Sequence, residues 1–261
     1  MGAAEVTNVK YNFSGKTILV TGAAQGIGRE VAMAFASAGG NICAADRNEE
    51  GLKTLVKDVS GLGGKCNIYT VDLSDSSDCV KMAEYFAEEE SKIDILINNA
   101  GLSFPETIID LDINHWDITL SVNLRAPAII TKIIGAKMIK QGGGAIVNVS
   151  SNAGIGGIEE HAAYCASKFG IHGLAKVMAI EFGPHNIRVN SVAPTVVLTP
   201  MGQQVWSDPK KADPVKKQIP LGRFAWPVEI SNTVLFLASD AATMIHGDVV
   251  LIDGGADARL Y

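Results

Sequence analysis

Short apolar runs alternate along the chain with longer segments in which apolar residues recur every three or four positions. The short runs are rich in β-branched residues and predict strands, whereas the longer segments predict helices. The expected strands cover residues 17–20, 41–45, 65–71, 93–97, 145–149, 188–192 and 249–252. The expected helices cover residues 29–38, 49–60, 76–89, 113–138, 163–182 and 227–238.

This alternation of strand and helix is the pattern of βαβ units, which build a parallel sheet. Most of the expected strands carry apolar residues at consecutive positions, as strands do when helices cover both faces of a sheet. We therefore expect an α/β fold: a Rossmann-type, doubly wound parallel sheet of about seven strands with helices on both faces.

No repeat, linker or break in composition divides the sequence, so residues 1–261 are expected to form a single domain with an N-terminal extension at 1–15. The least patterned stretch, at about 194–220, is rich in Pro, Gln and Lys. Because loops of that length in compact domains are commonly functional, we expect it to be a mobile lid over a substrate.

Composition and charge narrow the possible partners. The formal net charge is −6 and the few Lys/Arg doublets do not form a basic face, so nucleic acid is not an expected partner. The N-terminus does not resemble a signal peptide and prolines interrupt the uncharged stretch 189–207, so no membrane partner is expected. The widely spaced Cys43, Cys66, Cys79 and Cys165 fit free thiols, and we expect a cytoplasmic location.

A glycine-rich segment follows the first expected strand and opens the first expected helix. Small residues there let the backbone approach a pyrophosphate, which the free N–H groups and the positive dipole at the helix start stabilise. A glycine cluster alone is equally consistent with a simple turn, but the order of strand, glycines and helix favours a dinucleotide site. The expected cofactor contacts are Gly22, Gln25, Gly26, Ile27 and Gly28.

Acidic residues end the second and third expected strands. Asp46 lies 18 residues after Gly28 (46 − 28), near the interval of ~20 at which a carboxylate binds the ribose hydroxyls of a dinucleotide. That carboxylate repels a 2′-phosphate and favours NAD, whereas Arg47 either favours NADP or is a solvated surface charge. Asp72 either meets the adenine ring or caps the following helix.

Tyr164 and Lys168 are four residues apart in an expected helix, which places both side chains on one face. A phenol is a poor base at neutral pH because its ordinary pKa is near ~10, and a neighbouring ammonium lowers that pKa. The pair therefore has the chemistry of a proton-transfer site, although the spacing alone also occurs by chance.

These residues belong to a longer set of motifs, with which the chain resembles the short-chain dehydrogenase/reductase family over residues 16–255. The motifs are Thr21-Gly22-x-x-x-Gly26-x-Gly28, Asp72-Leu73, Asn98-Asn99-Ala100-Gly101, Asn123, Ser150-Ser151, Tyr164-x-x-x-Lys168, Pro194 and Asp253-Gly254-Gly255. The resemblance implies an NAD(P)-dependent oxidoreductase that interconverts a secondary alcohol and a ketone without a metal.

The resemblance also assigns roles to single residues. Ser151 would donate a hydrogen bond to the substrate oxygen, and Tyr164 would transfer the proton. Lys168 would bind the nicotinamide ribose and lower the pKa of Tyr164, while Asn123 would anchor a water between the lysine and solvent. The resemblance adds cofactor contacts at Leu73, Asn99, Ala100, Gly101, Pro194, Val197 and Thr199.

The expected lid resembles that of the family branch that contains L-xylulose reductase. Most relatives carry Pro-Gly where this chain has Pro194-Thr195, whereas that branch shares Pro-Thr. The likeness implies a sugar alcohol and ketose, or a small dicarbonyl, as substrate. The expected substrate contacts are Ser151, His161, Tyr164 and Trp206, although a lone His or Trp is more often a packing or surface residue.

Asp46 departs from that branch, whose members place a small residue before the arginine and use NADPH. The expected cofactor is therefore NAD, with NADP possible, and the cellular direction would lean toward polyol oxidation. Two alternatives stay open: a reductase of acyl chains or hydrophobic ketones such as steroids, and a catalytically silent nucleotide-binding protein. Because relatives usually pair through the helices expected at 113–138 and 163–182, a homotetramer is expected.

Overall fold

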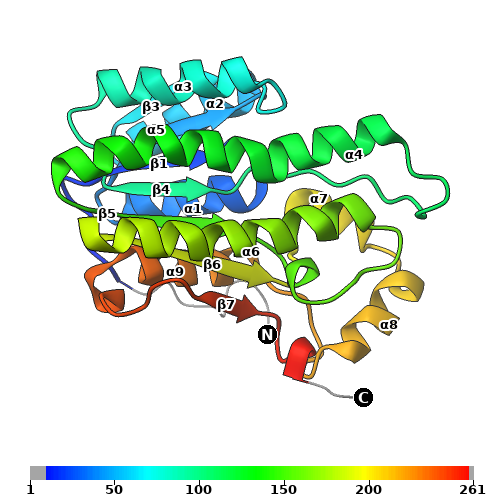
Figure 1. The fold of residues 1–261 in the computed structure, drawn as a ribbon. Helices are drawn as coiled ribbons and strands as arrows, with labels where there is room; N and C mark the ends of the chain where they lie inside the picture. Colours follow the sequence, from blue (N-terminus) through cyan, green and yellow to red (C-terminus); the bar gives the residue numbers. More distant parts are fainter. Residues whose placement is uncertain (1–9, 259–261) are drawn as a thin grey trace.

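A seven-stranded, all-parallel sheet with the order β3-β2-β1-β4-β5-β6-β7 forms the centre of the computed structural model, which describes residues 10–258 (Figure 1). The order reverses between β1 and β4, and in such sheets ligands bind in the crevice at the carboxyl ends of the strands beside that reversal. The strands are β1 (Thr17–Thr21), β2 (Asn41–Asp46), β3 (Cys66–Thr70), β4 (Ile95–Asn98), β5 (Gly144–Val149), β6 (Ile187–Pro194) and β7 (Val249–Ile252).

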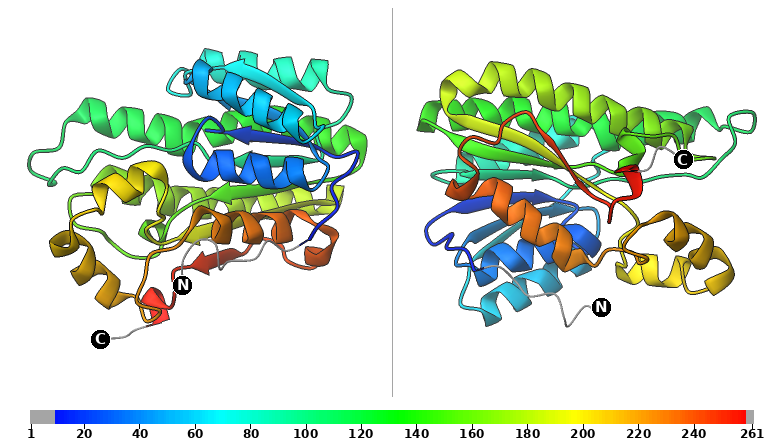
Figure 2. Two further views of the ribbon diagram at one scale, coloured as in Figure 1. Left: turned by 180° about the vertical axis from the view of Figure 1, so that it is seen from behind. Right: turned by 90° about the horizontal axis from the view of Figure 1, so that it is seen from below.

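Helices cover both faces of the sheet, which confirms the predicted fold class (Figure 2). One face carries α1 (Gly26–Ser37), α2 (Glu49–Gly61) and α9 (Pro227–Ala238), and the other carries α3 (Ser76–Glu89), α5 (Ala126–Gln141) and α6 (Ala162–Phe182). Successive strand residues supply opposite cores: Ile18 and Val20 pack on the α1 side, and Leu19 packs on the α3 side. This alternation explains why the strands are apolar at consecutive positions.

The helix expected at 113–138 has an interruption that its periodicity does not reveal. It begins as α4 (Ile113–Leu120), passes through the π-helical turn η2 (Ser121–Arg125) and continues as α5. The whole run, Ile113–Gln141, is long and apolar enough to cross a membrane by length and composition alone. Half of its most apolar window is buried inside the domain, and length and composition alone do not make the run a membrane span.

The segment expected to be an unstructured lid contains two helices, α7 (Pro200–Val205) and α8 (Pro209–Gln218), beyond the carboxyl ends of the strands (Figure 1). Thr199 and Asp208 cap them, each followed by proline at the first helical position, where its missing N–H costs nothing. Sequence reading took these prolines as loop signals, and that part of the prediction is wrong.

The remaining helical turns are short 3₁₀ segments: η3 (Asn152–Gly154), η4 (Gly183–His185), η5 (Asp240–Ala242) and η6 (Ala256–Ala258). Of the extension expected at 1–15, residues 1–9 lie outside the described residues. Phe13 does not extend away from the domain but is buried, and its ring packs edge-on against Phe35 at 4.7 Å between centroids.

Candidate active site

The glycine-rich segment forms a tight turn between β1 and α1, which begins at Gly26, three residues earlier than expected. Gly22 has φ +66°, and a Cβ there would lie 2.9 Å from the Cα of Ala100. A Cβ on Gly28 would lie 2.1 Å from the carbonyl oxygen of Gly22, so the helix and the turn touch through backbone alone. Only small residues allow this close approach.

The start of α1 is open to an anion. Gln25 precedes the helix and, within residues 10–258, makes no side-chain capping hydrogen bond, so the first N–H groups of α1 lack that partner. Free N–H groups and the helix dipole stabilise a phosphate at such a position. The cradle that a Cβ would fill and this uncapped start together fit the pyrophosphate of a dinucleotide.

Asp46 joins the end of β2 to the glycine turn. Its Oδ2 accepts a hydrogen bond from the N–H of Ala24 at 3.0 Å, and its Oδ1 accepts one from Asn48 at 2.9 Å. Arg47 is exposed. The carboxylate thus stands beside the expected pyrophosphate position, where a dinucleotide ribose would follow, and it does more than end the strand.

Asp72 does not cap α3, so one of the two readings of this residue is wrong. Its Oδ1 accepts hydrogen bonds from the backbone and hydroxyl of Ser74, at 2.9 and 2.8 Å. Asp75 is the helix cap, through the N–H groups of Ser77 and Asp78. Leu73 is buried in the core next to this turn.

Asn99 and Ala100 hold β4 against the glycine turn. The Asn99 side chain donates to the carbonyls of Thr21 and Gly22 at 2.9 and 3.1 Å, and the backbone N–H groups of Asn99 and Ala100 donate to the Thr21 hydroxyl. These contacts fix the two walls of the crevice at the point where the strand order reverses. Cofactor contact by these two residues stays a prediction.

Tyr164 and Lys168 lie one turn apart on α6, and the Lys168 Nζ is 5.4 Å from the centroid of the Tyr164 ring. Nζ donates a hydrogen bond to the Val149 carbonyl at the end of β5, at 3.0 Å. Lys168 is buried, whereas Tyr164 is partly exposed. The helix therefore presents the phenol to the crevice and keeps the amine beneath it.

Ser151 reaches the same place from the end of β5. It caps η3 by accepting from the N–H of Ala153 at 3.1 Å, and its hydroxyl donates to Asn152 Oδ1 at 3.2 Å. The turn rests directly on α6, because a Cβ on Gly154 would lie 2.6 Å from the Lys168 carbonyl. This close packing sets the serine beside Tyr164.

Asn123 lies in the π-helical turn η2, an arrangement frequent at functional sites. Its side chain pairs with the backbone of Leu102, both bonds being 2.9 Å, and donates to the Ser167 hydroxyl at 3.1 Å. A Cβ on Gly101 would lie 3.4 Å from Asn123 Oδ1 and 3.6 Å from Lys168 Nζ. The four expected catalytic residues therefore lie together in the structure.

Burial shifts the pKa of both Lys168 and Tyr164. It lowers the pKa of Lys168 from 10.5 to about 8, because a dry environment disfavours the ammonium. Burial also raises the pKa of Tyr164 above its ordinary value, and a hydrogen bond with the Ser151 hydroxyl opposes that rise. The sequence predicted that Lys168 would lower the pKa of Tyr164; in the protein alone, desolvation of the phenol raises that pKa instead.

The structure gives the expected substrate residues His161 and Trp206 different neighbours. The His161 ring stands edge-on to Tyr164 at 6.2 Å between centroids. Trp206 instead packs on Phe224, at 5.2 Å, in the small core of the lid. Thr199 caps α7 through the N–H of Gly202, and its methyl group lies 3.4 Å from where a Cβ on Gly26 would stand. The lid therefore begins against the glycine turn.

The other lid-base residues are held by backbone pairing. Pro194 ends β6, and the N–H of the following Thr195 donates to Ile252 at 3.1 Å. Val197 forms a bridge with Ala225. Contact of Pro194 and Val197 with a cofactor stays a prediction.

Sequence reading missed residues that support the site. Asn152 accepts the Ser151 proton, and Ser167 links the Tyr164 carbonyl to Asn123. Asn152 directly follows Ser151, and that adjacency is the signal that was available. Three buried hydroxyl oxygens, of Ser103, Ser150 and Ser191, have no hydrogen-bond partner within residues 10–258.

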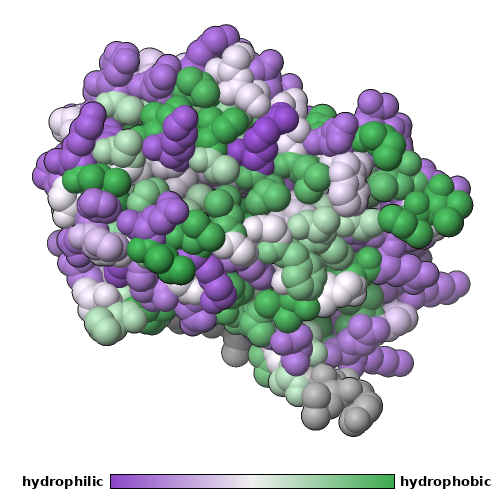
Figure 3. Space-filling view, in the orientation of Figure 1, coloured by the Kyte–Doolittle hydropathy of each residue, from purple (hydrophilic) through white to green (hydrophobic). Residues whose placement is uncertain are grey.

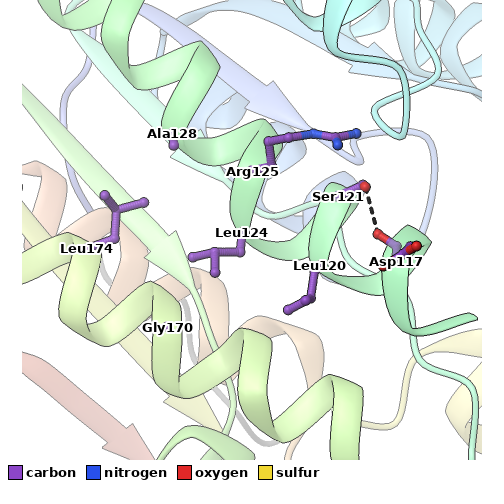
Figure 4. A pocket seen from close by; sticks show the side chains of 8 residues that line it. All are labelled: Asp117, Leu120, Ser121, Leu124, Arg125, Ala128, Gly170 and Leu174. Carbon is purple, nitrogen blue, oxygen red and sulfur yellow. Dashed lines mark hydrogen bonds between the residues drawn. The ribbon is translucent and has the colours of Figure 1, made fainter. Parts of the chain in front are cut away.

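A surface cavity of about 720 Å³ lies elsewhere, between the α4–η2–α5 run and α6 (Figure 4). Figure 4 shows Leu120, Leu124 and Leu174 in its lining, with Arg125 at the rim. The residues that line it include none of the predicted site residues. It belongs to the helical face through which subunits were expected to pair.

Comparison with known proteins gives a consistent picture over almost the whole chain. The model of one family, described as Enoyl-(Acyl carrier protein) reductase, matches residues 22–257. D-threitol dehydrogenase from Mycolicibacterium smegmatis is 43% identical over 257 residues, covering 98% of each chain. L-xylulose reductase from Bos taurus is 42% identical over 248 residues, covering 93% of this chain and 96% of the relative.

Solved structures agree with these relatives. A crystal structure from Beutenbergia cavernae, assigned as an NAD(P)-dependent gluconate 5-dehydrogenase with NADP bound at low occupancy, is 34% identical. It superposes with a TM-score of 0.91 over 95% of this chain and 99% of that chain. The fold is thus that of a known group of proteins.

Proposed function

The chain belongs to the short-chain dehydrogenase/reductase family, and from that premise we propose that it is an NAD-preferring oxidoreductase that interconverts a sugar alcohol and a ketose. The observation that carries the proposal is the meeting of Tyr164, Ser151 and the buried Lys168 beside the dinucleotide cradle. The sugar-alcohol class is supported by the lid sequence and by relatives that are named for D-threitol and L-xylulose.

The residues of the site supply the proton chemistry. The bound nicotinamide, when present, supplies or accepts the hydride. Tyr164 gives its phenolic proton to the carbonyl oxygen during reduction and takes it from the alcohol during oxidation. Ser151 turns its hydroxyl from Asn152 to the same oxygen and holds it at the phenol. Lys168 stabilises the phenolate by its charge, and Asn123 holds the backbone at Leu102 beside it.

The NAD preference rests on Asp46. Its carboxylate is fixed by Ala24 and Asn48 beside the cradle, so a 2′-phosphate placed there would meet an anion that cannot turn away. The exposed Arg47 offers a compensating charge, and the related gluconate enzyme was crystallised with NADP. Steady-state kcat/KM with both cofactors tests the preference, and a higher value with NADPH contradicts it.

His161 favours a substrate that carries extra hydroxyl groups. Its Nδ1 lies 2.7 Å from the Glu159 carbonyl, which only accepts, so Nδ1 carries the proton. In the neutral ring the other nitrogen, Nε2, then holds a lone pair that accepts a hydroxyl proton. A polyol or ketose offers such a hydroxyl next to the reacting carbon.

The alternative is a reductase of acyl chains or steroids, of which the description of the matching family model supports the acyl chains alone. A panel of tetritols, pentitols and their ketoses against 3-oxoacyl thioesters and steroid ketones separates the two. We expect turnover of the sugar alcohols with NAD, and activity confined to the hydrophobic ketones would overturn the assignment.

We also infer a cytoplasmic homotetramer. The four cysteines are unpaired in the described residues, which fits a reducing compartment.

The outer face of α6 exposes Phe169, Val177 and Ile180, at 49%, 50% and 78%, next to the cavity of Figure 4. Such an apolar face favours burial against a second subunit. Light scattering on a sizing column tests the tetramer, and any mass other than that of four subunits contradicts it.

A further inference from the structure

The loop between β4 and α4 runs along one side of the candidate site, and a single carboxylate fastens its far end. Glu106 Oε1 lies 2.5 Å from His115 Nδ1, and Glu106 Oε2 accepts from the N–H of Asp112 at 3.2 Å. The His115 ring also stacks on Phe104, with centroids 4.0 Å apart and planes 5° from parallel. Glu106 thereby ties the loop to the first turn of α4.

The backbone of Glu106 makes a second tie, to the segment before α6. Its N–H donates to the Glu160 carbonyl at 2.7 Å, and Glu106 forms a β-bridge with His161. Glu160 has φ +63°, a left-handed backbone conformation that residues other than glycine rarely adopt. Backbone strain of this kind persists only where the surroundings hold it, and it gathers at functional sites.

The two ties form a continuous line of contact from α4 to the phenol. His115 holds Glu106, Glu106 holds Glu160 and His161, and the His161 ring stands against Tyr164. The start of the loop is fastened separately, by Leu102 against Asn123. Removing the Glu106 carboxylate would therefore free the middle of the loop without detaching the catalytic asparagine.

Beyond Glu106 the loop is poorly anchored. Three isoleucines are exposed there: Ile108 at 66%, Ile109 at 89% and Ile113, the first residue of α4, at 65%. Figure 3 shows apolar side chains gathered at the right-hand end of the molecule, where the loop leads into α4. Side chains that bury little surface contribute little to holding a segment in place. We call the loop between β4 and α4, together with His161, the wall of the site. Its position thus depends on the polar contacts of Glu106.

We propose that Glu106 is a specificity-determining positioning residue: with His115 and Glu160 it fixes His161 as a closed wall, which limits the site to small hydroxylated substrates. This inference rests on the proposed function, because it names the device by which that site prefers a sugar alcohol to a bulky hydrophobic ketone. When the Glu106 carboxylate is removed, the backbone contacts of Glu106 with Glu160 and His161 lose their support from α4, so that the wall opens and His161 loses its fixed position.

The test compares Glu106→Ala, Glu106→Gln and His115→Ala with a control, Asp110→Ala, which removes a carboxylate of the same loop that, among residues 10–258, bonds only to Thr107 within that loop. For Glu106→Ala we expect the KM for the best sugar alcohol to rise about tenfold with kcat within about twofold, because about 1.4 kcal/mol of binding corresponds to a factor of ten. The KM for a bulky ketone should fall or stay constant.

Glu106→Gln keeps an acceptor for His115 and should restore most of the wild-type KM, and the double variant Glu106→Ala/His115→Ala should be no worse than either single one. The measured quantity is the ratio of the KM for the sugar alcohol to the KM for the bulky ketone. The proposal is overturned if this ratio is the same as in the wild type in both Glu106→Ala and His115→Ala. It is also overturned if Asp110→Ala changes the ratio as much as they do. The NAD dissociation constant, from quenching of protein fluorescence, confirms that each variant is folded; if Glu106→Ala does not fold, His115→Ala decides.

The wild-type panel keeps the two proposals apart. Wild-type turnover of hydrophobic ketones alone contradicts the proposed function. The wall is then tested by the KM for those ketones, which must fall in Glu106→Ala, and an unchanged KM contradicts the wall as well.

Discussion

The Nζ of Lys168 stands 5.4 Å from the centre of the Tyr164 ring and donates its hydrogen bond to the Val149 carbonyl rather than to the phenol. The two groups therefore interact through space, by charge, and the strength of that interaction depends on whether the buried amine is protonated. Because its pKa is about 8, the amine changes charge close to physiological pH.

Tyr164→Phe should lose turnover while it keeps cofactor binding. The ring, its packing and the neighbouring Lys168 remain, and only the group that transfers the proton is removed. Positioned acid–base groups contribute about 100- to 10,000-fold, so we expect kcat to fall within that range. The NADH dissociation constant, measured by fluorescence, should stay within about twofold, as about 0.4 kcal/mol would correspond to that factor. Equal kcat in both forms would eliminate the mechanism.

Lys168→Met should change how stability depends on pH. The unfolded chain keeps the Lys168 proton up to about pH 10.5, whereas the folded chain releases it near pH 8. Between these values the unfolded state binds more protons, so the free energy of unfolding of the wild type rises with pH relative to the variant. The pKa difference of about 2.5 (10.5 − 8) corresponds to about 3 kcal/mol at most.

Urea denaturation of both proteins at pH 7, 8, 9 and 10 measures this difference. All other titrating groups are shared and cancel when the variant is subtracted from the wild type; Tyr164, which interacts with Lys168, stays mainly protonated up to pH 10 because burial raises its pKa. A constant difference from pH 7 to 10 would contradict a lowered pKa, and a falling difference would mean that the buried amine is stabilised in its charged form.

The sequence was sufficient for the features that depend on local pattern. Consecutive apolar residues placed the strands, and the Tyr164 and Lys168 spacing placed the proton-transfer pair, because each signal lies within one element. The π-helical turn at Asn123 escaped notice, since apolar periodicity continues through it. The helices α7 and α8 escaped because they are short, proline-led and nearly without buried apolar residues.

Features that arise from packing between distant segments could not be read in the same way. The contact of Glu106 with His115 and Glu160 joins two loops and a helix, and no motif marks it. The raised pKa of Tyr164 follows from burial, which a helical spacing does not report. The position of Trp206 in the core of the lid likewise depends on Phe224, eighteen residues further along (224 − 206).

Asp46→Ser should shift the cofactor preference toward NADP. The substitution removes the charge that opposes a 2′-phosphate and leaves Arg47 free to bind it. We expect the ratio of kcat/KM for NADP over NAD to rise at least about tenfold, which corresponds to about 1.4 kcal/mol. Adding Arg47→Ala in the same chain should reverse most of the gain. No rise in Asp46→Ser would mean that the carboxylate does not face the ribose.

Gly28→Ala and Gly61→Ala should act in opposite directions, although both add one methyl group to a helix. A Cβ on Gly28 would lie 2.1 Å from the Gly22 carbonyl oxygen and 2.3 Å from the Asn99 Nδ2, and the backbone of the turn cannot yield without opening the cradle. A Cβ on Gly61, the last residue of α2, would meet no heavy atom within 4 Å among the described residues, apart from its chain neighbours and the backbone of its own helix.

We therefore expect Gly28→Ala to lose about 1–3 kcal/mol of unfolding free energy, as overpacked sites do, and to bind NAD more weakly. Gly61→Ala should gain about 0.5–1 kcal/mol, because alanine loses less backbone freedom on folding than glycine. Urea denaturation with and without NAD measures both. If Gly28→Ala were as stable as the wild type and bound NAD equally well, the turn would accommodate a Cβ despite the short distances. The pyrophosphate would then have to lie elsewhere.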